Sequence, residues 1–143
     1  IVGISHAAIE CLRARDALLS AGIEAEVIDP VSLSPLDVPM LAESVARTGR
    51  LLVVDSAWTA CGASAEIVAA VGEELGAGDH AFRFQRLGFA PVTCPTAKSL
   101  ERLYYPTAES IAIAAHDMLA GRATDWKPPA IQSPEVLQFR GPF

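Results

Sequence analysis

RLLVVDSAWTACGASAEI is the sequence of residues 50–67. Its four apolar residues Leu51–Val54 are too few for a helix, and two of them are β-branched, so they predict a strand that is buried on both faces. The polar loop Asp55–Ser64 follows this strand. The loop leads into a helix whose apolar residues recur at helical spacing on one face: Ile67, Val68, Val71 and Leu75. A buried strand, a loop and an amphipathic helix form the repeating unit of a parallel α/β sheet.

The sequence before residue 50 continues this alternation of strands and helices. Ile1–Ser5 and Ala25–Asp29 are predicted strands. The helix between them should run to about Ser20, and its inner side is predicted to carry Ile9, Leu12 and Leu19. We expect Asp37 to cap the next helix and Thr48-Gly49 to end it. This choice of cap places three apolar residues on the buried face: Met40, Leu41 and Val45.

The sequence after residue 75 predicts an edge strand, a short helical turn and one more helix. Ala81–Leu87 alternates imperfectly between apolar and polar residues, as an edge strand does. Ser99–Leu103 is the predicted turn, and the last helix begins at Pro106-Thr107 with three inner residues at a spacing of four: Ile111, Ala115 and Leu119. From Gly121 onward, prolines interrupt the pattern. We therefore expect a domain over residues 1–120 and a proline-rich tail over 121–143.

The order of these elements predicts a three-layer α/β fold of helix, sheet and helix. Each strand–helix–strand crossover is right-handed by rule, so the sheet is doubly wound and mainly parallel. We expect its four visible strands in the spatial order 2-1-3-4. Ligands of such sheets bind beyond the carboxyl ends of the strands, which here means Ser5-His6 and the loop Asp55–Gly62.

Composition and charge exclude several classes of protein. The 143 residues suit one domain with a real core. Hydrophobic residues make up 51%, yet no apolar run approaches the roughly 18 residues of a membrane span, so the excess belongs to the core or to a subunit interface. A net charge of −6 argues against a nucleic-acid partner. Three widely spaced cysteines suit the reducing cytoplasm, and the absence of an initiator methionine suggests a fragment of a longer chain.

Cys61 offers the sharpest catalytic hypothesis from chemistry alone. It precedes Gly62 near the start of a helix, where the helix dipole favours a thiolate. His6, at the end of the neighbouring strand, could serve as its base. Against this hypothesis, no third residue is evident to orient the histidine. Tight packing alone would also favour a small residue such as cysteine before Gly62.

Other polar residues near strand ends have structural as well as functional interpretations. Ala60–Ser64 could hold a phosphate at a helix N-terminus, but it has one glycine and no following lysine. Asp29 and Asp55 could hold a ribose or a metal ion, or they could cap loops and helices. His80 and His116 are expected to be solvated residues of a loop and a helix.

Aromatic residues outside the predicted core mark a candidate interface. Trp58, in a strand-end loop, is of the type that anchors a neighbouring chain or fills a crevice. Trp126, Phe139 and Phe143 suggest that the proline-rich tail packs against other residues. We predict a surface for self-association from five aromatic residues: Trp58, Tyr104, Tyr105, Phe139 and Phe143.

Several motifs, in order and correctly spaced, resemble one known family. They are Gly22–Asp29, Ser32–Asp37, Glu43–Leu51 and Gly62–Ile67, with matches that continue to about Leu119. Together they resemble the C-terminal domain of the beta subunit of thiamine-diphosphate-dependent 2-oxoacid dehydrogenases, which include pyruvate, branched-chain and acetoin dehydrogenases. Transketolase has a more distant version of this domain.

The resemblance implies that catalysis takes place elsewhere in the parent enzyme. In this family, thiamine diphosphate and Mg²⁺ lie between the alpha subunit and the N-terminal domain of the beta subunit. The resemblance therefore implies that this chain has no catalytic, cofactor-binding or metal-binding residues. Its implied partners are a second beta subunit, the alpha subunit and the lipoyl acyltransferase core of the multienzyme complex. Many members have an aspartate just after the glycine matching Gly88, whereas this chain has no acidic residue between Gly88 and Leu100.

Our preferred interpretation is a non-catalytic assembly and dimerisation domain. The parent enzyme would decarboxylate a 2-oxoacid on thiamine diphosphate and pass the acyl group to a lipoyl arm. The alternative is a flavodoxin-like module that binds a nucleotide or phosphate at the Asp55–Ser64 loop. A Cys61-dependent enzyme is the third hypothesis.

Overall fold

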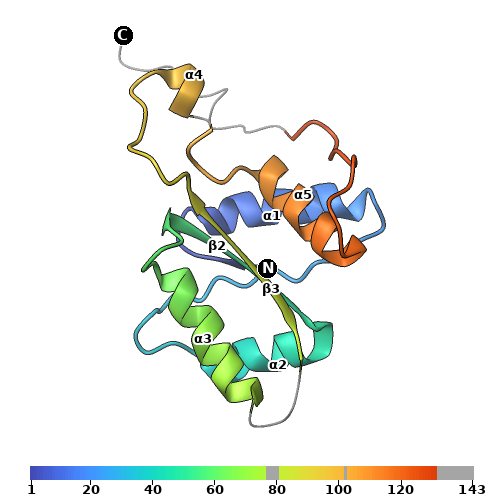
Figure 1. Ribbon diagram of the computed structural model, residues 1–143. Helices are drawn as coiled ribbons and strands as arrows, with labels where there is room; N and C mark the ends of the chain where they lie inside the picture. Colours follow the sequence, from blue (N-terminus) through green and yellow to red (C-terminus); the bar gives the residue numbers. More distant parts are fainter. Residues whose placement is uncertain (77–80, 102, 132–143) are drawn as a thin grey trace.

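The computed structural model describes residues 1–76, 81–101 and 103–131. Its elements, in order, are β1 (Val2–Gly3), α1 (Ala7–Leu19), α2 (Val38–Thr48), β2 (Arg50–Trp58), α3 (Ala63–Gly76), β3 (Arg83–Phe89), α4 (Lys98–Glu101) and α5 (Ala108–Ala120). The three strands form one parallel sheet in the order β1-β2-β3. Helices α1 and α5 cover one face of this sheet, and α2 and α3 cover the other (Figure 1). The predicted three-layer α/β fold is therefore confirmed.

The expected second strand, Ala25–Asp29, is reduced to a single bridge. Ile28 pairs in parallel with Val2, on the side of β1 that faces away from β2. The Ile28 N–H donates to the Ile1 carbonyl at 2.9 Å, and the Gly3 N–H donates to the Ile28 carbonyl at 3.0 Å. Because β1 is only two residues long, it offers no further partners in register. The sheet of the described residues thus has three strands and one bridge instead of four strands.

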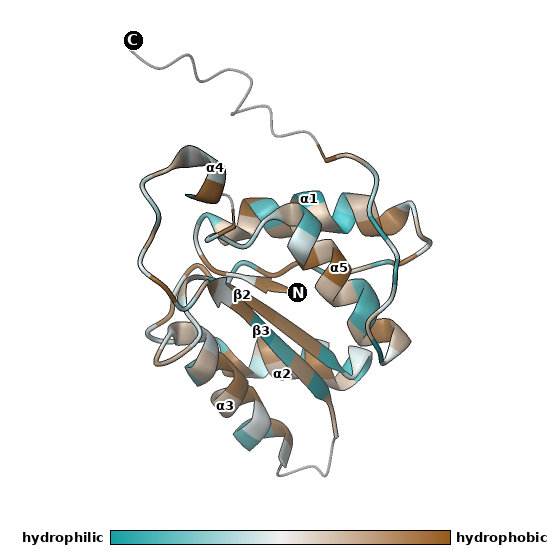
Figure 2. Cartoon of the chain, turned by 45° about the horizontal axis from the view of Figure 1, so that its top comes forward, coloured by the Kyte–Doolittle hydropathy of each residue, from teal (hydrophilic) through white to brown (hydrophobic). Residues whose placement is uncertain are grey.

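The predicted central strand is confirmed, and its side chains divide between the two faces. Leu51–Val54 are at most 3% exposed. Leu52 and Val54 pack with α1 and α5, whereas Leu51 and Val53 pack with α2 and α3. Burial of each such side chain is worth roughly 1.5–3 kcal/mol. Figure 2 shows brown, hydrophobic segments in the strands between the helices, with teal, hydrophilic bands among them.

The buried side of α1 differs from the prediction. Ile9, Leu12 and Leu19 are exposed, at 44%, 42% and 51%. The buried side instead carries mostly small residues: Ala7, Ala8, Cys11, Ala14, Ala17 and Leu18. The reason is a close approach of α1 to β1, because a Cβ on Gly3 would lie 2.7 Å from the Cα of Ala8. Larger side chains do not fit between elements that are this close.

The ends of α2 and α5 follow local sequence rules. Asp37 caps α2, as predicted, by accepting the Met40 N–H at 3.1 Å. Gly49 ends α2 in the left-handed conformation, with φ of 66°. Thr107 and Ser110 form a reciprocal capping box at the start of α5. Two residues expected on buried faces were assigned wrongly, since Met40 is 37% and Leu119 is 40% exposed.

Two acidic residues join elements that are distant in the sequence. The Oε2 atom of Glu10 in α1 accepts the Ala108 N–H at 2.8 Å, at the first turn of α5. The carboxylate of Glu26 accepts hydrogen bonds from Ser44 and Arg47 of α2. The bond from Ser44, followed by the bond and charge of Arg47, holds the pKa of Glu26 below its usual value. The Glu10 contact ties α1 to α5 within one outer layer, and the Glu26 contacts tie α2 to the segment before Ile28.

The chain after α5 has no regular structure over residues 122–131. Trp126 and Ile131 pack against the core cluster formed by α1 and α5. The predicted packing of Trp126 is thus confirmed. Phe139 and Phe143 lie outside the described residues.

Candidate functional site at the carboxyl edge of the sheet

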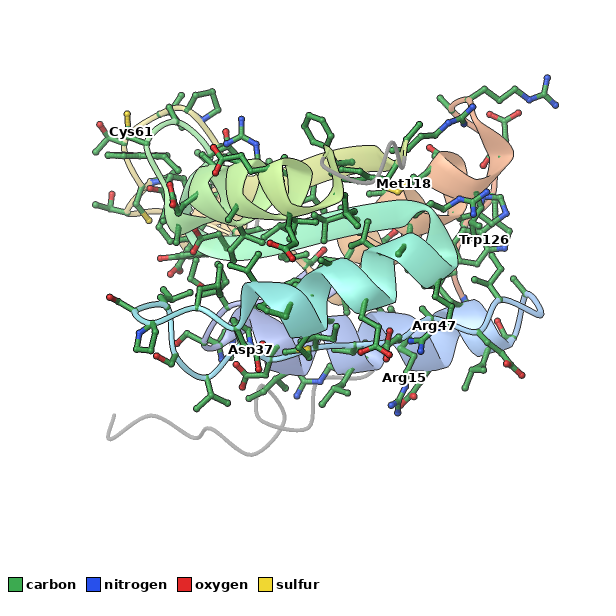
Figure 3. All side chains as sticks on the ribbon, turned by 90° about the horizontal axis from the view of Figure 1, so that it is seen from below. Arg15, Asp37, Arg47, Cys61, Met118 and Trp126 are labelled. Carbon is green, nitrogen blue, oxygen red and sulfur yellow. The ribbon has the colours of Figure 1, made fainter. Side chains whose placement is uncertain are left out.

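The strand ends converge on one edge of the molecule, and three residues there have left-handed backbones. Ser5, Val31 and Cys61 have φ angles of 58°, 54° and 58°. Ser5 follows β1, Val31 follows the Ile28 bridge, and Cys61 follows β2. Figure 3 shows Cys61 at one end of the molecule, and Trp126 lies near the opposite end. This carboxyl edge is where the fold predicts ligands or partners.

Asp55 acts as a cap within the chain. It is 5% exposed, and its Oδ2 accepts the N–H of Ser64, in the first turn of α3, at 3.3 Å. A carboxylate at this position also interacts favourably with the helix dipole. The neighbouring Gly62 is required by space, because a Cβ there would lie 2.3 Å from the Trp58 carbonyl and 3.2 Å from the Asp55 Oδ2. The structure therefore supports the capping interpretation of Asp55 over that of a ribose or metal ligand.

The same carboxylate argues against a phosphate site at Ala60–Ser64. An incoming phosphate at the N-terminus of α3 would meet the negative charge of Asp55, which already accepts the Ser64 N–H. Asp29 is likewise engaged, since its Oδ1 accepts the Val31 N–H at 3.0 Å. That bond closes a local turn and supports the left-handed conformation of Val31.

Cys61 and His6 do not form a catalytic pair in this structure. Both are exposed, and no hydrogen bond joins their side chains in the described part of the chain. Without a hydrogen bond between nucleophile and base, the geometry lacks the first feature of an activated thiol. The buried thiol of Cys11 is inert for a different reason, because burial raises its pKa to about 12.

Trp58 is exposed but firmly oriented. Its side chain is 53% exposed, and its indole N–H donates to the Ala90 carbonyl at 3.2 Å. The Ala90 N–H in turn donates to the Tyr104 carbonyl at 2.9 Å. Beside the indole lies an open pocket of about 520 Å³, which is lined by Trp58, Thr59, Ala60, Phe89, Pro91, Val92 and Thr93. The exposed Trp58 side chain therefore lies beside an open pocket on the same surface.

The other aromatic residues of the predicted interface have different environments. Tyr104 is 6% exposed and stacks on Phe89 with ring centroids 4.8 Å apart, so its ring offers little surface to another chain. Tyr105 is 43% exposed and meets Phe89 edge-on at 5.2 Å. Hydrogen bonding to the Cys94 thiol raises the pKa of Tyr105. Of the described candidates, Trp58 and Tyr105 are the ones that can contact a partner.

His116, expected to be solvated, is held in an aromatic stack instead. Its ring lies parallel to the Trp126 indole with centroids 4.4 Å apart. Thr124 completes the contact, because its Oγ1 donates to the Asp117 Oδ1 at 2.7 Å and lies 3.1 Å from the His116 Nδ1. The hydrogen bond from Thr124 lowers the pKa of Asp117. These residues fasten the chain after α5; His80 lies outside the described residues.

The described residues contain no cluster of candidate metal ligands. In the described ranges, no group of three or more His, Cys, Asp or Glu side chains is placed to hold one. The edge carboxylates Asp29 and Asp55 accept backbone N–H groups of their own chain. These residues do not fit a magnesium diphosphate group. None of the helices in the described ranges is long and apolar enough to span a membrane.

Comparison with known proteins decides the family. The model of the transketolase C-terminal domain matches residues 1–111. The chain belongs to this family. Among the relatives of this domain is the beta subunit of acetoin:2,6-dichlorophenolindophenol oxidoreductase from Cupriavidus necator, which is 40% identical over 111 residues. Those residues are 77% of this chain and 32% of that protein.

Further relatives are beta subunits as well. The mitochondrial pyruvate dehydrogenase E1 component subunit beta of Chaetomium thermophilum is 39% identical over 125 residues, which cover 83% of this chain and 31% of that protein. The beta subunit of acetoin:2,6-dichlorophenolindophenol oxidoreductase from Bacillus subtilis is 34% identical over 108 residues, which cover 76% of this chain and 31% of that protein. The resemblance to the C-terminal domain of 2-oxoacid dehydrogenase beta subunits is confirmed. The chain spans about a third of the length of these relatives.

Sequence reasoning missed two features of the site. It made no prediction for Glu10, whose carboxylate accepts the Ala108 N–H at the first turn of α5. It also did not foresee that the Trp58 indole N–H would donate to the carbonyl of Ala90, 32 residues away. Neither contact has a local sequence signal, because both partners come together only through the packing of the layers.

Proposed function

We propose that this chain is a non-catalytic assembly domain from the beta subunit of a 2-oxoacid dehydrogenase. The observation that carries the proposal is the match of residues 1–111 to the transketolase C-terminal domain, with beta subunits as relatives. The parent enzyme would decarboxylate a 2-oxoacid on thiamine diphosphate and Mg²⁺ and transfer the acyl group to a lipoyl-bearing acyltransferase. In this proposal the cofactor is bound by other domains, and this chain contributes shape and contact surface.

The geometry of the carboxyl edge supports a role without chemistry. The side chains that the sequence suggested for catalysis or ligand binding either form hydrogen bonds within the chain or are not hydrogen bonded to the residue with which they would react. Asp55 caps α3, Asp29 closes a turn, and Cys61 is not hydrogen bonded to His6 in the described structure. The flavodoxin-like alternative would need the N-terminus of α3 to bind a phosphate, but the Ser64 N–H there already donates to the Asp55 carboxylate.

The proposed partners are those of an assembly domain: a second copy of this domain, the alpha subunit and the acyltransferase core. Trp58 and Tyr105 are the described aromatic residues with surface to offer. Phe139 and Phe143 belong to the same proposed interface, whereas the ring of Tyr104 stacks on Phe89 within the chain and offers little surface to a partner. The cytoplasmic location stays a prediction.

Calorimetric titration of the chain with thiamine diphosphate and Mg²⁺ tests the assignment of roles. We expect no heat of binding, because the edge carboxylates Asp29 and Asp55 already accept backbone N–H groups of their own chain. A micromolar dissociation constant would overturn the proposal. In the complete complex of alpha and beta subunits, Cys61→Ala should leave turnover within about twofold, since a surface substitution without a catalytic role has little effect. A loss of turnover with an intact assembly would restore the nucleophile hypothesis.

A further inference from the structure

The chain that follows α5 turns back and runs along that helix. Gly121 ends α5 in the left-handed conformation, with φ of 72°, and the chain returns beside the helix (Figure 1). Thr124 is hydrogen bonded to the last turn of α5. Residues 128–131 line a hollow of about 280 Å³ together with residues 107–109, at the start of the same helix. Residues 122–131 therefore extend from one end of α5 to the other, and we call them the strap.

Four side chains fasten the strap near the end of α5. The N–H and the Oγ1 of Thr124 both donate to the Oδ1 of Asp117, at 3.0 and 2.7 Å. A hydroxyl has a single proton, so the same Oγ1 accepts from the His116 Nδ1, 3.1 Å away, and from the Trp126 N–H at 3.3 Å. The Trp126 indole stacks on the His116 ring with centroids 4.4 Å apart. We call the contacts among these four residues the latch.

Beyond the latch, the strap is held by side-chain packing alone. No backbone–backbone hydrogen bond joins residues 122–131 to another part of the described chain. Alternate side chains of the strap are partly buried: Thr124, Trp126 and Pro128. Segments without backbone pairing open at a much lower free energy than a sheet does. Pro128 and Pro129 restrict the backbone of the open strap, so less conformational entropy is lost when it closes.

We propose that the strap closes over the α1/α5 layer through the latch and opens as one unit while the sheet stays folded. In the closed state, Trp126 and Ile131 pack against the core cluster of α1 and α5. The chain thereby covers this surface itself, and a partner could reach it only when the strap is open. The family model matches residues 1–111, so the strap lies beyond the matched part of the chain. The inference goes beyond the proposed assembly role and does not depend on it.

Native-state hydrogen exchange of the 143-residue chain, measured for single amides by NMR, tests the proposal. The Thr124 amide should be protected from exchange, but less than the amides of the central strand β2. Trp126→Ala should lower the protection of the Thr124 amide at least about tenfold, although the acceptor Asp117 is unchanged, because the latch holds or opens as a unit. His116→Ala removes the other ring of the stack and should act in the same direction. Circular dichroism verifies that each variant is folded.

Two control variants separate opening of the strap from other effects. Trp58→Ala makes the same substitution at the other tryptophan, 53% exposed at the carboxyl edge, and should change the protection of the Thr124 amide by less than about twofold. Asp55→Ala removes the cap of α3, on the opposite face of the sheet, and should lower the protection of β2 but not of the strap.

Three results would overturn the inference. An unprotected Thr124 amide in the parent chain would mean that the strap is not closed. A Thr124 amide insensitive to both Trp126→Ala and His116→Ala would mean that the contacts of the latch are independent of one another. Protection of the strap that falls together with that of β2 in Asp55→Ala would mean that the strap opens only when the whole domain unfolds.

Discussion

Replacing Asp55 with alanine asks whether this buried carboxylate stabilises the fold. Asp55 is 5% exposed and accepts the N–H of the fully buried Ser64 at 3.3 Å. In Asp55→Ala that N–H loses its acceptor, which costs about 1–3 kcal/mol for a buried group. Loss of the negative charge at the start of α3 costs about 0.3–1 kcal/mol more. Relief of the desolvated charge offsets part of this cost, so we expect the free energy of unfolding to fall by about 2 kcal/mol.

Urea unfolding, followed by circular dichroism, measures this change. With a denaturant slope of about 2 kcal/mol per molar, the midpoint should fall by about 1 M without a change in slope. Asp55→Asn is the matched control, because its side-chain oxygen can still accept the Ser64 N–H. It should lose less than about 1 kcal/mol, the part that depends on charge. An alanine variant as stable as the parent chain would show that Asp55 is not a cap and would reopen its assignment as a ligand group.

Two further predictions concern close packing and thiol chemistry. Gly3→Ala places a Cβ 2.7 Å from a backbone atom of α1 and should lower the free energy of unfolding by about 1–3 kcal/mol. Gly76→Ala meets nothing within 4 Å and should change it by less than about 1 kcal/mol in the same urea series; equal losses would contradict the close approach of α1. At neutral pH a thiol-reactive dye should label Cys61 and Cys94, which are exposed, but not Cys11, whose pKa of about 12 keeps it protonated. Labelling of three thiols at the same rate in the folded chain would refute this assignment.

Much of the fold could be predicted because its signals are local. The run Leu51–Val54 has the length and composition of a doubly buried strand, and it is one. Asp37 and Gly49 mark the ends of α2 because a short carboxylate and a residue without Cβ satisfy helix ends wherever the chain goes next. The edge strand was expected at Ala81–Leu87 and lies two residues later, at Arg83–Phe89. The spacing of turn residues does not fix such boundaries.

The candidate site was harder to predict, because each of its residues had two chemical interpretations. Asp55 has the same sequence context whether it caps α3 or binds a ligand, and the contact with Ser64 decides between them. Trp58 was correctly identified as a residue outside the core, but Tyr104 is covered by Phe89 within the chain. The sequence predicted a solvated His116, but its ring stacks on Trp126, which lies ten positions later in the chain.

The sequence by itself determined the order of strands and helices, the central buried strand, the helix caps and the family to which the chain belongs. Each of these depends on residues that lie within a few positions of one another or on motifs in fixed order. The tertiary structure alone decided which side of α1 is buried. Its hydropathy allows two stripes, one with Ile9 and Leu12 and one of alanines with Cys11, and the second is buried because Gly3 brings the backbones of β1 and α1 together. Only packing between layers could make that choice, since it depends on distances that no local pattern encodes.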